Sequence, residues 1–436
     1  MKKISLVLFQ ILIVHIGFSQ PVKKFITEEN VSRVIKTLAS DDMMGRSATQ
    51  PEHIEKATAF IENEFKQIGL KPLTGLTPFR QEFKKDMIIP QRLEITINGT
   101  SIAREHSVVA SESTSINYTM GLTVKSINYD TTIKNKRQFL LSKAFGLVRS
   151  DTISTLVLID PEFHAEFKEL GGYFGKRFLN NRKSTKIFVL GNYAVQSYSV
   201  SATQKIESIT MANVVGVLPG KTRPDEFVVF SSHYDHIGIS PAVNGDSISN
   251  GADDDASGTT AVIELARYYK RIKNNQRTLI FAAFTAEEIG GFGSKYFSEQ
   301  LNADKVVAMF NIEMIGKPSK WGHNYAFITG YERSDFGEIL QKNLKGTPFE
   351  FRADPYPEQN LFYRSDNATL ARLGVPAHSI STDEIDIDKF YHTVDDEVET
   401  LDMANLVSTI RAIALSSKSI VNGTDTPKRI DKATVR

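Results

Sequence analysis

The chain contains no cysteine among its 436 residues. Disulfides, a cysteine nucleophile and thiolate metal ligands are therefore all excluded. Stability must come from burial of an apolar core, and any bound metal must be held by histidine, aspartate and glutamate. The length exceeds that of one typical domain, which predicts a large core with a second unit inserted or appended.

A surplus of charge of either sign is also lacking, because 52 basic residues are matched by 51 acidic ones. The sequence therefore shows no electrostatic footprint for nucleic acid or for an anionic membrane surface. We expect peptides or proteins as substrates and no nucleic acid as a partner, and the oligomeric state stays open.

One apolar stretch, residues 4–18, lies at the N-terminus behind two lysines. Gly17 and Ser19 then form a small-x-small cleavage site, which predicts a signal peptide over 1–19 and a mature chain that starts at Gln20. The stretch is short for a spanning helix, and no cysteine follows it to carry a lipid. The sequence thus predicts an exported protein, secreted or periplasmic, without stable membrane insertion after signal removal.

Strongly apolar strand patterns alternate with helical patterns from residue 206 onward. After the loop at 250–258, apolar residues recur at helical spacing from Ala261 to Ile272. This alternation predicts an α/β fold, a three-layer α/β/α sandwich around a mostly parallel mixed sheet, in which ligands gather at the carboxyl ends of the strands. The strand candidates are Val214–Leu218, Phe227–Phe230, Thr278–Phe284, Val306–Ile312, Ala326–Thr329 and Ala377–Ser381.

The region before this part has a different pattern. Two amphipathic helical patterns open the mature chain, the second of which stops at Gly69, and short alternating segments such as Arg92–Ile97 and Thr155–Ile159 follow. We expect a β-rich insert, for which a protease-associated fold is one candidate, and a polar tail that is disordered because it lacks apolar periodicity. The predicted organisation is a discontinuous main domain over 20–85 and 206–420, the insert over 86–205 and the tail over 421–436.

Acidic and histidine residues collect directly after the apolar strands. His233 follows one strand, Glu287 and Glu288 follow a second, and Glu313 follows a third; a Gly-Ala-Asp-Asp-Asp-Ala-Ser-Gly loop precedes a helix, and His392 comes near the end. Such a cluster of like charges is unfavourable unless a cation neutralises it. Zinc accepts imidazole nitrogen and carboxylate oxygen. Two ions about 3.5–4 Å apart need a bridging carboxylate, terminal ligands on both sides and a shared water, and the sequence supplies that inventory with one residue left over as a base.

The ordered set HxDH, GADDDASG, AEE, NxEM and YHT resembles the zinc-dependent aminopeptidases of metallopeptidase family twenty-eight. That family includes secreted bacterial leucyl aminopeptidases and aminopeptidase S, and it is related to the glutamate carboxypeptidases. The similarity covers approximately residues 24–85 and 206–415. A motif such as AEE is weak by itself, whereas the ordered set is specific.

The resemblance implies two zinc ions with five protein ligands. One ion would take His233 and Glu313, the other would take Glu288 and His392, and Asp254 would bridge the two.

Three further residues receive roles through the same resemblance. Glu287 would be the general base and acid, which takes a proton from the attacking water and delivers it to the leaving amine. Asp235 would be the carboxylate that orients His233, and Asp255 would follow the bridging ligand across a cis peptide bond.

Some nearby residues are interpreted more simply. An aspartate run before a helix is often only a helix cap, and we interpret Asp253 as a solvated loop residue. His236 is not included among the metal ligands. It either supports a ligand or is a surface residue. Glu313 stands where most family members have aspartate. In a sister family of dizinc peptidases, a glutamate at the equivalent position is found in carboxypeptidases rather than in aminopeptidases.

Several functions follow from these residues. The leading hypothesis is a dizinc aminopeptidase. The alternative is a carboxypeptidase or dipeptidase, for which Arg364 is a candidate to bind the substrate carboxylate. A glutaminyl cyclase fits less well, because the glutaminyl cyclases related to this family use one zinc ion. A non-catalytic binding module also fits less well, because no metal ligand is missing from the sequence.

Overall fold

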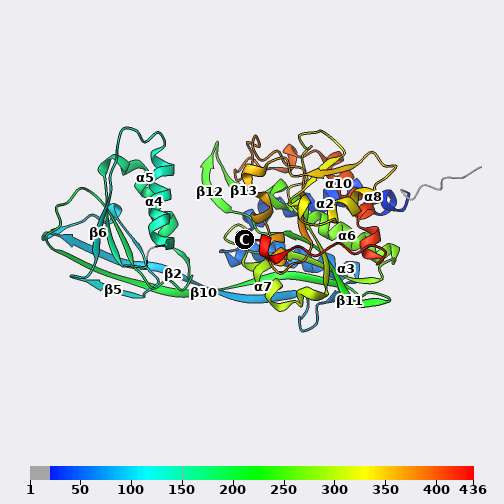
Figure 1. The fold of residues 1–436 in the computed structure, drawn as a ribbon, viewed down its shortest axis with the longest axis horizontal. Helices are drawn as coiled ribbons and strands as arrows, with labels where there is room; N and C mark the ends of the chain where they lie inside the picture. Colours follow the sequence, from blue (N-terminus) through cyan, green and yellow to red (C-terminus); the bar gives the residue numbers. More distant parts are fainter. Residues whose placement is uncertain (1–19, 151) are drawn as a thin grey trace, which may run out of the picture. The chain divides into compact units, whose positions relative to one another are not determined.

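The computed structural model describes residues 20–150 and 152–436, so the predicted signal peptide lies outside the described residues. The chain forms two compact units (Figure 1): the first joins the part up to Phe83 to Met211–Arg436, and the second is Lys84–Thr210. These boundaries differ by a few residues from the expected 85/86 and 205/206. The strands β2 (Arg80–Ile97) and β10 (Tyr198–Leu218) run unbroken through the two boundaries, so no turn residue marks them.

The first unit is built on a mixed sheet with the strand order β17-β16-β18-β15-β11-β14-β10. β11 pairs in parallel with β14 and β15, and β15 with β18, whereas β10 and β16 run antiparallel to β14 and β18. The short β1 (Lys71–Pro72) pairs with β10. The remaining strands are β11 (Arg223–His233), β14 (Arg277–Phe284), β15 (Val306–Ile312), β16 (Tyr325–Ile328), β17 (Glu350–Ala353) and β18 (Ala377–Ser381), with a hairpin of β12 (Gly238–Val243) and β13 (Asp246–Ser249).

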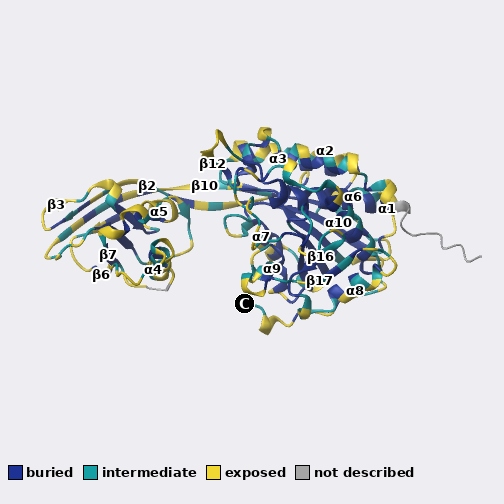
Figure 2. Cartoon of the chain, turned by 90° about the horizontal axis from the view of Figure 1, so that it is seen from above, coloured by how far each residue is buried: buried dark blue, intermediate teal, exposed yellow. Residues whose placement is uncertain are grey.

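Helices cover both faces of this sheet, which confirms the predicted three-layer sandwich. Alternate side chains of β11 point to opposite faces, so Phe230 joins one apolar cluster and Val229 joins the other. Figure 2 shows the strands buried between helices whose outer faces are exposed. One face is covered by α1 (Gln20–Phe25), α2 (Glu28–Leu38), α3 (Pro51–Ile68), α6 (Gly258–Ile272), α8 (Phe336–Asn343), α10 (Met403–Ser416) and α11 (Lys418–Val421), and the other by α7 (Phe292–Gln300) and α9 (Asn367–Ala371).

Local signals set the ends of the first helices. The Thr27 side chain accepts a hydrogen bond from the Asn30 N–H and begins α2, while Pro51 occupies the first turn of α3. α3 ends at Gly69, whose φ of 79° is the left-handed conformation that glycine adopts without strain. The predicted end of this helix is confirmed.

The second unit contains a four-stranded sheet in the order β4-β9-β7-β6. One face packs on its two helices through residues such as Phe167 and Phe188, and the other packs on strands that include β2, β5 and β10 through Leu156 and Ile187. The elements are β3 (Thr100–Ser101), β4 (Ser107–Ala110), β5 (Ser115–Tyr118), β6 (Thr123–Ile127), α4 (Lys136–Ser150), β7 (Thr155–Ile159), α5 (His164–Phe174), β8 (Arg177–Phe178) and β9 (Lys186–Leu190).

The prediction of a disordered tail is wrong. The Arg277 guanidinium donates to the Asp425 carbonyl and to the Thr426 hydroxyl, and Ile430 is buried in the cluster beneath α9. Arg277 belongs to β14, far away in the sequence, so the tail owes its order to contacts that its own composition does not reveal. Within the part of the chain that the structure describes, no helix is long and apolar enough to cross a membrane.

Candidate metal centre

The predicted site residues stand at one edge of the sheet. His233 is the last residue of β11, Glu313 follows the end of β15, and Glu287 and Glu288 come shortly after β14. β11, β14 and β15 are parallel neighbours, so their carboxyl ends meet and bring these side chains together. His392 lies in the loop after β18, the next parallel strand.

The aspartate run forms an irregular turn, Ala252–Ser257, directly before α6, and the backbone angles of Asp254 and Asp255 are not helical. The peptide bond between Asp254 and Asp255 is cis, as the resemblance implies. The Asp255 carboxylate is fully buried and accepts N–H bonds from Gly258 at 2.9 Å, Met314 at 3.1 Å and His233 at 3.3 Å. It therefore ties the start of α6 to the ends of β11 and β15, and fixes the backbone on which the neighbouring Asp254 sits.

Asp254 lies between two separate groups of donors. Its Oδ1 is 3.2 Å from His233 Nε2, and its Oδ2 is 3.1 Å from His392 Nε2. The same His392 nitrogen is 3.1 Å from Glu288 Oε2. Two ligand atoms on one tetrahedral zinc, each at about 2.0–2.1 Å, are roughly 3.3 Å apart. The spacing fits one ion on each oxygen of Asp254, with Glu288 beside His392.

Glu287 and Glu313 complete the wall of this cluster. Both line the same cavity as Asp254, Glu288 and His392. The Glu287 N–H donates to Asp235 Oδ1 at 3.1 Å, which orients the segment after β14.

The carboxyl groups of this cluster have perturbed acidities. Burial raises the pKa of Glu313 to about 7 and raises the pKa of Glu287 well above its ordinary value. Burial also opposes ionisation of Asp254, but hydrogen bonds from His233 and His392 hold its pKa well below its usual range. Crowded carboxyl groups of this kind are ionised together only when a cation offsets their charge. The donor set therefore suits a divalent metal.

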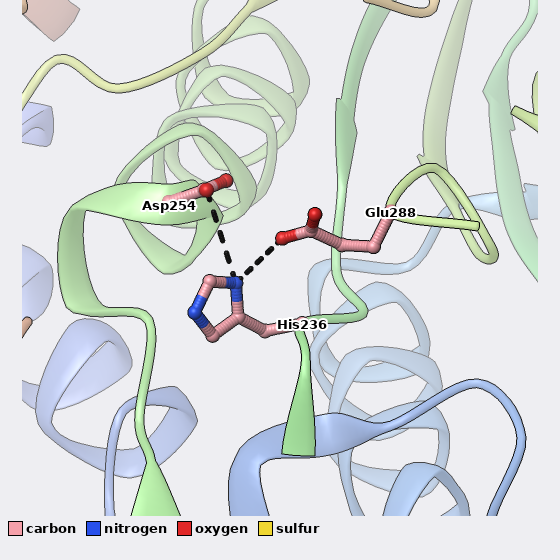
Figure 3. A group of neighbouring side chains, drawn as sticks. All are labelled: His236, Asp254 and Glu288. Carbon is pink, nitrogen blue, oxygen red and sulfur yellow. Dashed lines mark hydrogen bonds and ion pairs between the residues drawn. The ribbon is translucent and has the colours of Figure 1, made fainter. Parts of the chain in front are cut away.

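His236 is a member of the cluster that the sequence interpretation left open. Its side chain is buried, and Figure 3 shows it between two carboxylates, with Nδ1 2.7 Å from Glu288 Oε1 and 3.9 Å from Asp254 Oδ2. The surface alternative is therefore wrong. The second histidine of the HxDH motif was the only signal for it, and that motif does not say which way the ring turns.

The expectation for Asp253 needs correction, and the surroundings of His233 are more detailed than the motif indicates. Asp253 is not a solvated loop residue: it is fully buried, and its Oδ1 accepts the Gly316 N–H at 2.7 Å while Oδ2 lies 3.4 Å from Lys317 Nζ. The His233 ring donates from Nδ1 to the Asp235 main-chain carbonyl at 3.1 Å, whereas the Asp235 carboxylate is 3.8 Å away. The main chain of Asp235 is thus the nearer partner of the ring, and its carboxylate, which also lies beside Nδ1, accepts the Glu287 N–H.

The cavity beside the cluster has a largely apolar wall, formed by Met314, Phe327, Leu361, Ile385 and Tyr391. The Tyr391 ring stacks on that of His392 with centroids 3.9 Å apart. A predominantly apolar hollow with a few convergent polar groups is the usual form of a small-ligand site.

The three-layer fold and the carboxylate–histidine cluster at its strand ends define a metal-dependent hydrolase scaffold. Residues 213–416 match the model of Peptidase family M28, and this part of the chain is an M28 domain, of a zinc metallopeptidase family. The resemblance inferred from the motifs is thereby confirmed.

Sequence relatives carry related names. A "Probable zinc metalloprotease" of Pyrenophora teres f. teres is 34% identical over 28% of this chain and 26% of that protein. Aminopeptidase YwaD of Bacillus subtilis is 24% identical over 53% of this chain and 50% of that protein. The chain thus spans at most half the length of these two curated relatives.

Solved structures show the same fold. An aminopeptidase from Aneurinibacillus sp. strain AM-1 superposes with a TM-score of 0.57 at 17% identity, and the match covers 96% of this chain and 98% of that one. The zinc aminopeptidase BSAP from Bacillus subtilis gives a TM-score of 0.54 at 17% identity, over 94% and 99% of the two chains.

Proposed function

We propose that the protein is a dizinc exopeptidase that removes single residues from the amino ends of peptides. The observation that carries this proposal is the position of Asp254, whose two oxygens face two different histidines at 3.1–3.2 Å. In the proposed centre His233 and Glu313 hold one ion, Glu288 and His392 hold the other, and Asp254 bridges them. Two zinc ions in such a centre polarise the scissile carbonyl and acidify the attacking water.

Glu287 is the proposed proton carrier. It lines the cavity beside the donor set, and its pKa is raised by burial, which suits a group that must accept a proton and release it again near neutral pH. We assign it the proton of the attacking water, which it then gives to the leaving amine. His236 and Asp235 hold Glu288 and the Glu287 main chain in place.

Amino-end specificity follows from the charge of the site. A free amine is a cation at neutral pH and is attracted to the carboxylates around Asp254, whereas an acylated amine is neutral. The apolar wall with Phe327 and Leu361 then accepts the side chain of the terminal residue. A leucyl substrate suits this combination.

The test is hydrolysis of leucyl- and alanyl-anilides by the zinc-loaded protein, with zinc counted per chain. We expect two zinc ions per chain and turnover of the free-amine substrates, no turnover of their N-acetyl forms, and loss of one or both ions in Asp254→Asn. A protein that carries two ions yet leaves every unblocked substrate intact would refute the proposal.

A carboxypeptidase or dipeptidase is the second candidate, because Arg364 lines the same cavity as the metal-binding residues. Peptides with a blocked amino end distinguish the two functions. Cleavage of N-acetyl peptides with a free carboxylate, and none of C-amidated peptides, would favour the carboxypeptidase.

Export is proposed on the sequence of residues 1–19, and the protein would then act in the periplasm or outside the cell. Expression of the full chain in a bacterial host, followed by N-terminal sequencing of the exported fraction, should give Gln20 as the first residue. Full-length protein confined to the cytoplasm would contradict export.

A further inference from the structure

Two cavities of the first unit meet at the candidate metal centre. The first is the apolar-walled cavity described above, and the second has a volume of about 480 Å³, within the size range of small-ligand sites. The residues that line both cavities are Glu287, Glu288, Arg364, Ser365, Tyr391 and His392. The proposed nucleophile site therefore lies where the two cavities join, and a substrate cleaved there places one part in each.

The second cavity, which we call the basic cavity, is lined by Lys295, Arg364 and Arg372. All three side chains are exposed, and they come from α7, from the segment before α9 and from the end of α9. Lys295 and Arg372 do not line the apolar-walled cavity, so this positive charge lies on one side of the metal centre. The basic cavity is thus chemically different from its neighbour.

These cations have no acidic side chain to neutralise them. Within residues 20–150 and 152–436, no ion pair joins any of the three to an aspartate or glutamate side chain. Arg364 donates to Gln359 Oε1 at 3.0 Å and lies 3.5 Å from the Tyr391 hydroxyl, and Arg372 donates to the main-chain oxygen of Arg436 at 2.6 Å. Arg364 and Lys295 therefore keep N–H groups free for a ligand.

The carboxylates that line the basic cavity are less exposed than its cations. Glu287 and Glu288 belong to the proposed centre, and the Asp366 side chain is buried, whereas Lys295, Arg364 and Arg372 are exposed. The exposed part of the cavity wall that a ligand meets is consequently cationic.

We infer that the basic cavity binds a carboxylate on the residue that follows the cleaved bond, an inference that rests on the function proposed above. The terminal residue occupies the apolar-walled cavity with its amine at the acidic centre. The next residue extends past Arg364 into the basic cavity. A guanidinium pairs with a carboxylate through parallel hydrogen bonds, and Lys295 adds a second positive charge.

Two sources supply the same chemistry. In a dipeptide the carboxylate is the free carboxyl end, and in a longer peptide it is the side chain of an aspartate or glutamate at the second position. The enzyme therefore prefers dipeptides, or peptides with an acidic second residue, over neutral longer substrates.

The experiment compares two matched pairs of substrates with the zinc-loaded full chain. One pair is leucyl-glycine and leucyl-glycine amide; the other is leucyl-glutamate amide and leucyl-glutamine amide. We expect kcat/KM to be about tenfold higher for the charged member of at least one pair, a typical effect of a charge-assisted hydrogen bond at an exposed site, carried mainly by KM. The preference should weaken at high salt because the cations are exposed.

Substitutions assign the preference to the basic cavity. Arg364→Gln and Lys295→Gln should each lower the charged-to-neutral ratio several-fold. The matched controls Arg271→Gln and Lys345→Gln remove the same charges from exposed positions elsewhere in the first unit and should keep the wild-type ratio. Because the readout is a ratio within one protein, partial loss of fold or metal does not imitate the effect.

Each result decides between the proposals. A preference in the first pair alone identifies the free carboxyl end, and a preference in the second pair alone identifies the acidic side chain. Equal kcat/KM within both pairs, or a preference that survives in Arg364→Gln and Lys295→Gln, would overturn the inference and leave the peptidase proposal standing. A zinc-loaded protein that cleaves none of the four peptides would overturn the peptidase proposal itself.

Discussion

Arg46 is the residue whose replacement tests most directly how the site depends on the fold. Its guanidinium is fully buried and donates to four main-chain carbonyls, those of Leu38, Tyr234, Asn250 and Gly251, at 2.5–3.0 Å. Tyr234 follows His233, and residues 250–251 lead into the turn that carries Asp254. One side chain thus holds together two of the loops that supply candidate ligands.

We expect Arg46→Met to lower the free energy of unfolding of zinc-free protein by about 4 kcal/mol. The estimate takes about 1 kcal/mol for each of four buried hydrogen bonds, because methionine fills the space without replacing a donor. A loss of that size is a large part of the stability of a typical domain. The free energy of unfolding of Arg46→Lys should lie between those of the wild type and Arg46→Met, since an ammonium offers only three donors and lacks the planar fork of a guanidinium.

Urea unfolding followed by circular dichroism measures the stability, and chelator competition measures zinc affinity. Arg271→Met on the exposed side of α6 is the control and should cost less than about 0.5 kcal/mol. An Arg46→Met variant that is as stable as that control, or that unfolds more easily yet binds zinc with unchanged affinity once folded, would contradict this role of Arg46.

Three further predictions concern the proposed centre and the core around it. Glu287→Gln should lower kcat by about 10²–10⁴-fold with two zinc ions still bound; loss of metal in this variant would show that Glu287 is a ligand instead. His236→Ala should weaken zinc binding by roughly 10–100-fold in chelator competition, because the ring holds Glu288, while His323→Ala, which alters a half-exposed histidine, should not. Burial lowers the pKa of His378 to about 4. As the pH falls from about 6.5 to 4, His378 is therefore protonated in the unfolded chain but stays neutral in the folded chain. In urea unfolding, the contribution of His378 to the free energy of unfolding should be fully present above pH 6.5 and should decline by up to roughly 3 kcal/mol toward pH 4. In His378→Gln the free energy of unfolding should fall less steeply with pH. Equal pH dependence in the two proteins would contradict this prediction.

The sequence allowed the fold and the collection of acidic and histidine residues at the strand ends to be predicted because both depend on local patterns, whereas the ligand set came from the family resemblance. Apolar strands such as Val306–Ile312 mark the sheet, and the residue after a parallel strand must lie at its carboxyl edge. His233 and Glu313 could therefore be placed together before any distance was known. Their roles as ligands stay predictions, which the observed spacing around Asp254 supports.

Other features depended on partners far away in the sequence. Asp253 is buried because Gly316 and Lys317 reach it from beyond β15, and a run of aspartates gives no sign of such partners. The choice between the Asp235 carbonyl and its carboxylate as the partner of His233 depends on one turn of the backbone. In each case the residue type was right for the site, and the direction of the side chain came only with tertiary structure.

The dispersal of the donors along the chain has a consequence for biosynthesis. The candidate ligands run from His233 to His392, and Arg46, which holds two of their loops, belongs to a segment made much earlier. Synthesis proceeds from the amino end, so a growing chain lacks His392 until almost all of the first unit has been made. The complete donor set, and with it the proposed centre, can therefore form only after nearly all of the first unit has been synthesised.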